Sequence, residues 1–260
     1  MMHDDPVLCS AFSRDGEFLV TGCQAGQVKV WKLKTGALLR KFPKAHPEGI
    51  TSVSFSADGT QILSTSFDCS VRLHGIRSGK MLKEFRGHTS YVNAACFSQS
   101  GDVFSSASDG TIKHWDAKST DCLRTIRPGV DPSSGGGLKE EAVHTLQMLP
   151  GGVTGQAELI FACTKSCRAY LLTMQGDTVA TLSSGKLEGG DFVCATVSPR
   201  GKWVYCAGED GVVYVFSVHS GQLELALPAS DKEIIGIAHH PLRNRLITYT
   251  DDGALKLWQA

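Results

Sequence analysis

The segment that decides the fold is GHTSYVNAACFSQSGDVFSSASDGTIKHWD, which runs from Gly87 to Asp116. Its first part, residues 91–97, alternates apolar and polar side chains as a half-buried strand does. Two more strand-like runs follow at 103–108 and 111–115, and polar turns separate them. Short runs joined by such turns predict an antiparallel sheet, with a fourth strand at 122–126.

The same pattern recurs about every 42 residues along the chain. One residue, usually aromatic, closes the third strand of each repeat; these residues are Trp31, His74, Trp115, Leu172, Phe216 and Trp258. The steps between them are 43, 41, 57, 44 and 42 residues. A period of this size, carried by strands, is typical of four-stranded propeller blades. We therefore predict an all-β chain forming a β-propeller with six recognisable blades.

The repeats predict one propeller domain over residues 1–260. Their approximate bounds are 1–42, 43–86, 87–127, 142–183, 184–227 and 228–260. The one long step contains PGVDPSSGGGLKEE at 128–141, whose Gly- and Ser-rich composition predicts a flexible insertion. The last repeat has no fourth strand, so we expect an open sheet edge at 255–258.

Composition excludes several classes of protein. Lys plus Arg equal Asp plus Glu at 26 each, so there is no net charge to attract nucleic acid or an anionic membrane. Any such contact would need a local patch. No apolar run approaches the ~20 residues of a membrane span, and residues 1–10 do not form a signal peptide.

No motif indicates a metal or a cofactor. The cysteines number nine, and most lie in strand-like runs, which favours free thiols in a reducing compartment. Cys163 and Cys167 do not have zinc-site spacing, and His239 with His240 lacks a third ligand nearby. No phosphate-binding loop is present either.

Polar residues recur in register with the strands. In the third repeat, His88, Ser105, Asp109 and Trp115 resemble the structural tetrad of WD-repeat propellers, in which an indole, a hydroxyl, an imidazole and a carboxylate form one hydrogen-bonded chain. Partial sets occur elsewhere: His46, Ser64 and Asp68; His3, Thr21 and Trp31; and Thr248, Asp252 and Trp258. A hydrolase triad would not repeat with this period, and no Gly-x-Ser-x-Gly elbow accompanies it. We expect no catalytic residues.

The tetrad pattern also predicts which residues lie on one rim of the propeller. They include Phe67, Tyr91, Asn93, Asp191, Glu209 and Glu233. The two rings are the expected anchors for a protein partner, because large rings dominate binding energy when a partner buries them. The acidic members favour a basic peptide or protein surface over RNA at this rim. The alternative is that these residues are merely solvated.

Several stretches resemble the Smu-type WD-repeat proteins, which are associated with the spliceosome. They are DDPVLCSAFSRD from Asp4, GKMLKEFRGHTSYVN from Gly79, SSGKLEGGDFVCATVSPRGKWVYCAGED from Ser183, IIGIAHHP from Ile234 and DGALKLW from Asp252. The family's propeller has seven repeats, so six repeats here imply an incomplete seven-bladed ring. The family also carries an N-terminal LisH and CTLH region that binds the RED protein. No such region is present here, so a RED-type partner is not expected.

The resemblance implies a nuclear, non-enzymatic scaffold in pre-mRNA splicing, with the cytoplasm as a further location. Its partners would be other spliceosomal proteins, without a small-molecule substrate, a membrane or direct RNA binding. An adaptor in another assembly, such as a ubiquitin ligase substrate receptor, is the alternative, because fold alone does not set function.

Overall fold

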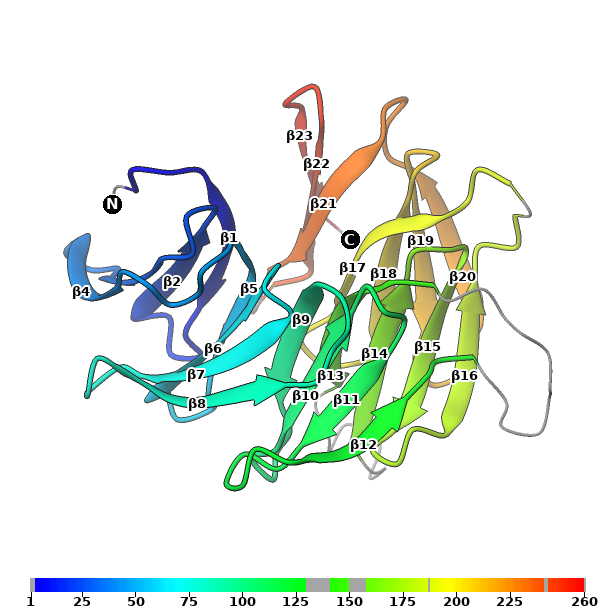
Figure 1. Cartoon of the computed structure of the whole chain (residues 1–260). Coiled ribbons are helices and arrows are strands. Elements are labelled where there is room, and N and C mark those ends of the chain that lie inside the picture. The colour runs from blue at the N-terminus through cyan, green and yellow to red at the C-terminus, as the bar shows by residue number, and fades with distance from the viewer. Residues whose placement is uncertain (1–2, 130–140, 150–157, 187, 241–242, 260) are drawn as a thin grey trace. The chain divides into compact units, whose positions relative to one another are not determined.

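All regular structure in the described residues is β-strand (Figure 1). The computed structural model describes residues 3–129, 141–149, 158–186, 188–240 and 243–259. Its strands form six antiparallel sheets, which we call blades 1 to 6 in chain order. The all-β, six-bladed prediction is thus confirmed. The chain divides into two compact units, Met1–Ile126 and Arg127–Ala260, and each is described by itself.

Unit 1 contains blades 1 to 3, each with four strands in which chain neighbours pair. Blade 1 comprises β1 (Val7–Phe12), β2 (Phe18–Cys23), β3 (Val28–Lys32) and β4 (Ala37–Phe42). Blade 2 comprises β5 (Ile50–Phe55), β6 (Gln61–Ser66), β7 (Ser70–Gly75) and β8 (Lys80–Arg86). Blade 3 comprises β9 (Val92–Phe97), β10 (Val103–Ala107), β11 (Ile112–Trp115) and β12 (Cys122–Ile126), each within one residue of its predicted bounds.

Unit 2 contains blades 4 to 6. Blade 4 comprises β13 (Val143–Leu149), β14 (Leu159–Thr164), β15 (Arg168–Thr173) and β16 (Thr178–Ser183). Blade 5 comprises β17 (Phe192–Val197), β18 (Trp203–Gly208), β19 (Val212–Ser217) and β20 (Leu223–Pro228). Blade 6 comprises β21 (Ile234–His239), β22 (Arg245–Thr250) and β23 (Leu255–Gln259).

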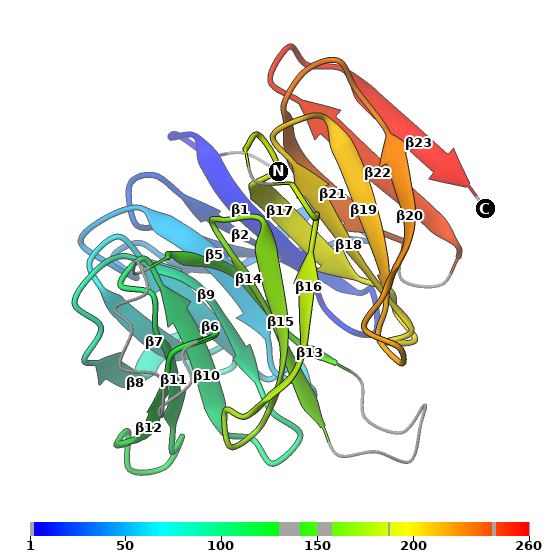
Figure 2. The same ribbon diagram turned by 90° about the vertical axis from the view of Figure 1, so that its right-hand side faces the viewer.

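Within each unit, the first strands of neighbouring blades pack together. β1 contacts β5 and β5 contacts β9, whereas β13 contacts β17 and β17 contacts β21. Figure 2 shows the three sheets of unit 2 side by side in chain order. The first strand of a blade begins at the same end as the turn between its second and third strands. We call this end the rim end, and the turn between the first and second strands the first turn.

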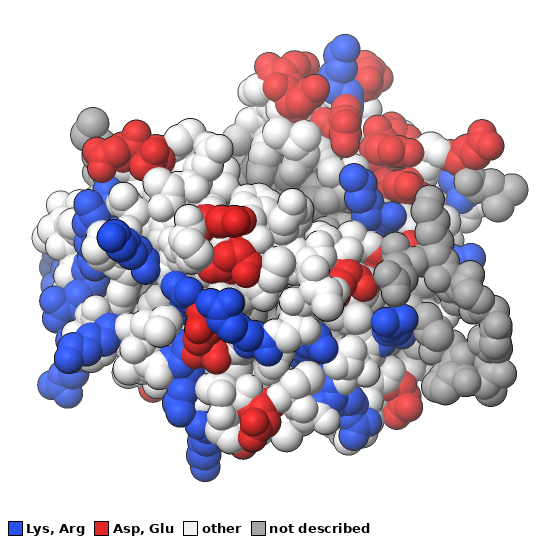
Figure 3. Space-filling model, in the orientation of Figure 1, with Lys and Arg blue, Asp and Glu red and all other residues white. Residues whose placement is uncertain are grey.

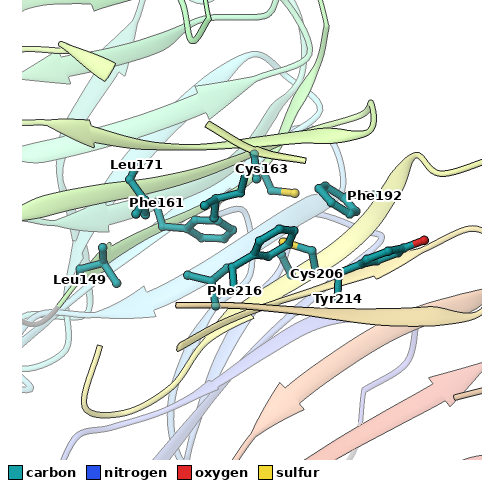
Figure 4. Packing of buried hydrophobic residues seen from close by; sticks show 12 residues of the cluster. Leu149, Phe161, Cys163, Leu171, Phe192, Cys206, Tyr214 and Phe216 are labelled. Atoms are coloured by element: carbon teal, nitrogen blue, oxygen red, sulfur yellow. The ribbon is translucent and has the colours of Figure 1, made fainter. Parts of the chain in front are cut away.

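Apolar side chains fill the space between blades 4 and 5. Phe161, Cys163 and Leu171 from blade 4 face Phe192 and Phe216 from blade 5 (Figure 4). These five side chains are at most 1% exposed. Their burial is what holds the two sheets against each other, because apolar area removed from water is the main stabilising term.

Blade 6 has three strands in the described residues, and β23 is its outer strand. Leu255 and Leu257 on this strand are 66% and 58% exposed. Within the described residues, β23 pairs only with β22, and the open edge at 255–258 stays a prediction. Residues 130–140 of the predicted insertion lie outside the described residues, and the single domain and the seven-bladed ring stay predictions.

The structure contains no disulfide among the nine cysteines, all of which lie in described residues. The described residues contain no cluster of three metal-ligating side chains. In the same residues, no helix has the length and apolar character that crossing a membrane requires.

Candidate functional site

Four side chains of blade 3 form one hydrogen-bonded chain. Trp115 Nε1 lies 2.8 Å from Ser105 Oγ, and Ser105 Oγ lies 2.8 Å from His88 Nε2. His88 Nδ1 is 3.0 Å from Asp109 Oδ2. The indole N–H can only donate, so the Ser105 hydroxyl must donate onward to His88 Nε2, and His88 Nδ1–H donates to Asp109. Every polar atom of this chain thus has a partner in a buried place.

The Asp109 carboxylate closes the turn at the rim end of blade 3. Besides His88, it accepts hydrogen bonds from the Thr111 hydroxyl and from the backbone N–H of Thr89 and Thr111. Burial raises the pKa of Asp109, but the hydrogen bonds from His88, Thr111 and Thr89 outweigh it and leave the pKa well below its usual range. The carboxylate therefore stays charged and holds the turn.

Blade 2 builds the same chain with a histidine in place of the indole. His46 Nδ1 lies 2.9 Å from Asp68 Oδ2, and Ser64 Oγ lies 2.8 Å from both His46 Nε2 and His74 Nε2. Burial opposes ionisation of Asp68, yet hydrogen bonds from His46 and Ser70 lower its pKa to about 2. His74 Nδ1 is buried and has no hydrogen-bond partner among the described residues. The ring of His74 can therefore be accommodated only in its neutral form.

We expect the stability of unit 1 to fall as the pH drops below about 6.5. Burial, and then the charges of His46 and Arg72, lower the pKa of His74 to about 3. The unfolded chain protonates at His74 near pH 6.5 and the folded chain only near pH 3, so this stability is complete above about pH 6.5 and is lost progressively below it. The slope approaches about 1.4 kcal/mol per pH unit.

Urea unfolding at a series of pH values measures this slope. His74→Phe, which removes the titrating ring nitrogens, should flatten the slope between about pH 6.5 and 4.5. The matched control, His219→Phe at an exposed histidine of unit 2, should leave it unchanged. An equal slope in the wild type and His74→Phe would contradict the assignment.

Blade 1 lacks the carboxylate. Trp31 Nε1 donates to Thr21 Oγ1 at 2.8 Å, and Thr21 Oγ1 lies 2.7 Å from His3 Nε2. His3 Nδ1 is buried with no hydrogen-bond partner in the described structure. Ala25 stands 22 residues after His3, the same separation as between His46 and Asp68.

Ala25→Asp should therefore stabilise blade 1 by about 1 kcal/mol, because the new carboxylate can accept from His3 Nδ1–H. The following residue, Gly26, has a φ of 73°, close to the 74° of Gly110 after Asp109, so the turn already has the required form. Urea unfolding gives the change in the free energy of unfolding. The same substitution in a His3→Ala background should give no gain; an equal gain there would mean that His3 is not the partner.

In blade 6 the structure brings together only part of the predicted set. Trp258 Nε1 donates to Thr248 Oγ1 at 3.0 Å. Asp252 instead accepts from the Thr250 hydroxyl and from the N–H of Ala254, so it caps its own turn. Asp252 has the same spacing to Trp258 as Asp109 has to Trp115, but Ser230 stands four residues before the first strand, where blade 3 has the linking His88.

Blade 5 contains a different polar cluster at the place of the tetrad, and we did not predict it from the sequence. Asp210 Oδ2 accepts from the Tyr214 hydroxyl at 2.6 Å and pairs with Lys186 Nζ at 2.5 Å. Burial raises the pKa of Asp210, but Lys186 and Tyr214 outweigh it, so the pKa is lowered overall. The sequence does contain one signal for this pair, because Gly185-Lys186 stands before the first strand of blade 5 as Gly87-His88 stands before that of blade 3. Lys186 lies six residues before the first strand, whereas His88 lies four before its own.

The predicted rim residues lie at the rim ends of their blades, three of them in unit 1 and three in unit 2. In unit 1, the rings of Phe67 and Tyr91 meet edge to face at 5.3 Å, and they are 38% and 51% exposed. Asn93 Nδ2 donates to the Ser108 hydroxyl beside them. Phe67 also packs against Gly49, where a Cβ would lie 3.1 Å from the ring. The aromatic pair is thus held in place while remaining accessible.

The acidic group lies in unit 2. Asp191, Glu209 and Glu233 are all exposed, and the backbone N–H of Glu209 donates to the Asp191 carbonyl. Figure 3 shows mostly red side chains, with a blue one among them, at the top of unit 2, and the β22–β23 turn there contains Asp251 and Asp252. This end of unit 2 is therefore acidic.

Four segments match the model of the WD domain, G-beta repeat: residues 2–32, 36–74, 79–116 and 177–217. Together they cover more than half of the chain. The chain belongs to the WD40 repeat family. The first three strands of blade 4 and all of blade 6 lie outside these matches. Blade 4 keeps the strand order of the other blades, but Ala162, Ser166 and Leu172 stand where blade 3 has Ser105, Asp109 and Trp115.

Three curated relatives illustrate which proteins align with most or all of this chain. The WD40 repeat-containing protein smu1 of Dictyostelium discoideum is 42% identical over 100% of this chain and 47% of its own length. The U3 small nucleolar RNA-associated protein 15 homolog of Xenopus tropicalis is 29% identical over 89% of this chain and 44% of its own. Telomerase protein component 1 of Mus musculus is 27% identical over 99% of this chain and 9% of its own. The chain thus spans half or less of the length of these relatives.

The buried tetrads do not suit a hydrolytic reaction. Ser105 is fully buried, and its hydroxyl already bonds to Trp115 and His88. A hydroxyl held on two sides is not placed to attack a substrate. The WD40 repeats and the likeness to smu1 instead support a protein-interaction scaffold.

Proposed function

We propose that this chain is a non-enzymatic scaffold that acts in pre-mRNA splicing as a spliceosome-associated factor in the nucleus. The observation that carries the proposal is 42% identity to smu1 over 100% of the chain, together with the Smu-type stretches of the sequence. The U3 small nucleolar RNA-associated relative shows that similar chains occur in other assemblies. A ubiquitin ligase substrate receptor is one such alternative.

The partner contact that we propose is the aromatic pair of unit 1. Phe67 and Tyr91 expose large rings that are fixed by their edge-to-face contact and by Gly49. Rings that are already ordered lose little freedom on binding, so burying them favours association. Cys69 lies on the same turn as Phe67. Burial raises the pKa of its thiol, and the nearby charges of Asp68, Glu48 and Asp109 raise it further. A basic protein segment would complement these charges.

Affinity purification of the tagged chain from nuclear extract tests both proposals. Recovery of spliceosomal proteins supports the splicing role, and recovery of cullin-type ligase components in their place would overturn it. The variant Phe67→Ala/Tyr91→Ala should lower that recovery. Phe12→Ala, which removes a ring that is 66% exposed elsewhere in unit 1, is the matched control. Equal recovery with both variants would exclude the aromatic pair as the contact.

A further inference from the structure

A pocket of about 520 Å³ lies in unit 2 at the ends of blades 5 and 6 opposite their rim ends. Its lining includes Arg200, Lys202 and Trp203 from the first turn of blade 5, and His239, Arg243 and Asn244 from the first turn of blade 6. This volume falls within the range of about 300–1,000 Å³ that is usual for ligand sites. No described residue that lines it carries a carboxylate.

The three cations of this pocket have no acidic partner in the part of the chain that the structure describes. Among the described residues, neither Arg200, Lys202 nor Arg243 forms an ion pair. The chain as a whole has no net charge, so a concentration of unpaired cations here is a local feature. Unpaired cations around a concave site attract an anion.

The first turn of a blade does not need the positive charge of Arg200, because blades 1 and 2 carry an acid at the same position. The corresponding turns read SRDG in blade 1 and SADG in blade 2, but SPRG in blade 5. Asp15 and Asp58 each accept hydrogen bonds from the serine that starts the turn and from a backbone N–H. Arg200 stands where this capping carboxylate would be, so blade 5 has given up a turn-stabilising acid for a cation.

The aromatic residue of this turn is also exposed. Trp203, the first residue of β18, is 37% exposed, whereas Val204 after it is fully buried. A second pocket of about 270 Å³ shares His239 and Asn244 with the first and adds Tyr205, Arg245 and Trp258. The two pockets adjoin at His239 and Asn244, and we call them together the groove. Aliphatic side chains of blade 5 line much of the second pocket; they are Val213, Val215, Leu225 and Leu227.

We propose that this groove binds a segment of single-stranded nucleic acid. Arg200, Lys202 and Arg243 contact phosphates, and a base stacks on Trp203, which is how single strands are bound without sequence preference. A phosphorylated peptide would match the cations but would leave the exposed ring without a role. The acidic rim end, at which RNA is disfavoured, lies at the opposite end of the same strands. The inference does not depend on the proposed scaffold function.

Fluorescence anisotropy with a labelled oligouridine of about 12 nucleotides tests the proposal, and an oligothymidine of equal length distinguishes RNA from DNA. We expect a Kd of about 10⁻⁶–10⁻⁴ M at low salt. Three phosphate contacts predict that log K falls against log salt with a slope of about −2 between about 50 and 200 mM. Lys202→Ala and Arg243→Ala should each reduce this slope by about 0.7.

Arg200→Asp separates binding from folding. It restores the capping acid found in blades 1 and 2, so the melting temperature should stay level or rise while nucleic-acid affinity falls at least about tenfold. Trp203→Leu should weaken binding at least about fivefold through loss of stacking. Arg14→Ala, at an exposed cation in the first turn of blade 1, is the matched control and should bind as the wild type does.

Three results would overturn the assignment. They are no oligonucleotide binding at about 50 mM salt, equal affinity in the wild type and Arg200→Asp, and tighter binding of a phosphopeptide or of vesicles containing phosphatidylserine than of either oligonucleotide. In the last case the groove is an anion site for another class of partner.

Discussion

Phe192→Ala should lower the free energy of unfolding of unit 2 by about 3–5 kcal/mol. Phe192 is fully buried between blades 4 and 5, and its ring meets those of Tyr214 and Phe216 at 5.7 and 6.2 Å. Truncation removes the buried ring, leaves a cavity and breaks two edge-to-face contacts. The strands around Phe192 are hydrogen-bonded within the sheets of blades 4 and 5, so they cannot move far enough to fill the cavity.

Urea unfolding followed by circular dichroism measures the loss. Phe12→Ala removes the same atoms from a site that is 66% exposed and should change stability by less than about 1 kcal/mol. A loss of under about 1 kcal/mol for Phe192→Ala would show that blades 4 and 5 do not depend on this packing.

Ser105→Ala should destabilise blade 3 by about 2–4 kcal/mol. The Ser105 hydroxyl accepts from Trp115 Nε1–H and donates to His88 Nε2. Its removal leaves a buried donor and a buried acceptor without partners, and each such group costs about 1–3 kcal/mol. The effect is larger than the loss of a single hydrogen bond for this reason.

The neighbouring Ser106 provides a matched control. It is equally buried on β10, but its hydroxyl has no hydrogen-bond partner in the described structure. Ser106→Ala should therefore be neutral or slightly stabilising, because it removes an unsatisfied polar group. Thermal and urea unfolding of both variants would show the difference; equal losses at Ser105 and Ser106 would mean that the hydrogen-bonded chain adds nothing.

The strands were predictable because their residues alternate and their turns contain Gly. In blade 3 we predicted the third strand at 111–115, and it runs from Ile112 to Trp115. Thr111 belongs to the preceding turn, because its hydroxyl donates to Asp109. The bulges in the first strands were not predictable. The register between β1 and β2 shifts between Val7 and Cys9, and the same shift recurs between β5 and β6 at Ile50 and Ser52. Alternation alone does not locate such an extra residue.

The candidate sites were predictable to different degrees. The spacing of His88, Ser105, Asp109 and Trp115 is enough to place them together, because each residue has a fixed position on a strand or turn. The Lys186 to Asp210 pair was missed since a flexible Lys side chain can reach from a different position. The groove at Arg200 and Arg243 was missed as well. It depends on which turns of two blades lie side by side, and no single repeat contains that information.

Every β-strand in both units pairs with a strand that is its neighbour in the chain. Hydrogen bonding therefore requires only short loops to close, which gives the chain a low contact order and rapid formation of each sheet. During synthesis, a blade can complete its own pairing soon after its roughly 40 residues have left the ribosome, before the next blade exists. Folding can then proceed in the order of translation, and a defect in one blade delays its neighbour rather than the whole chain.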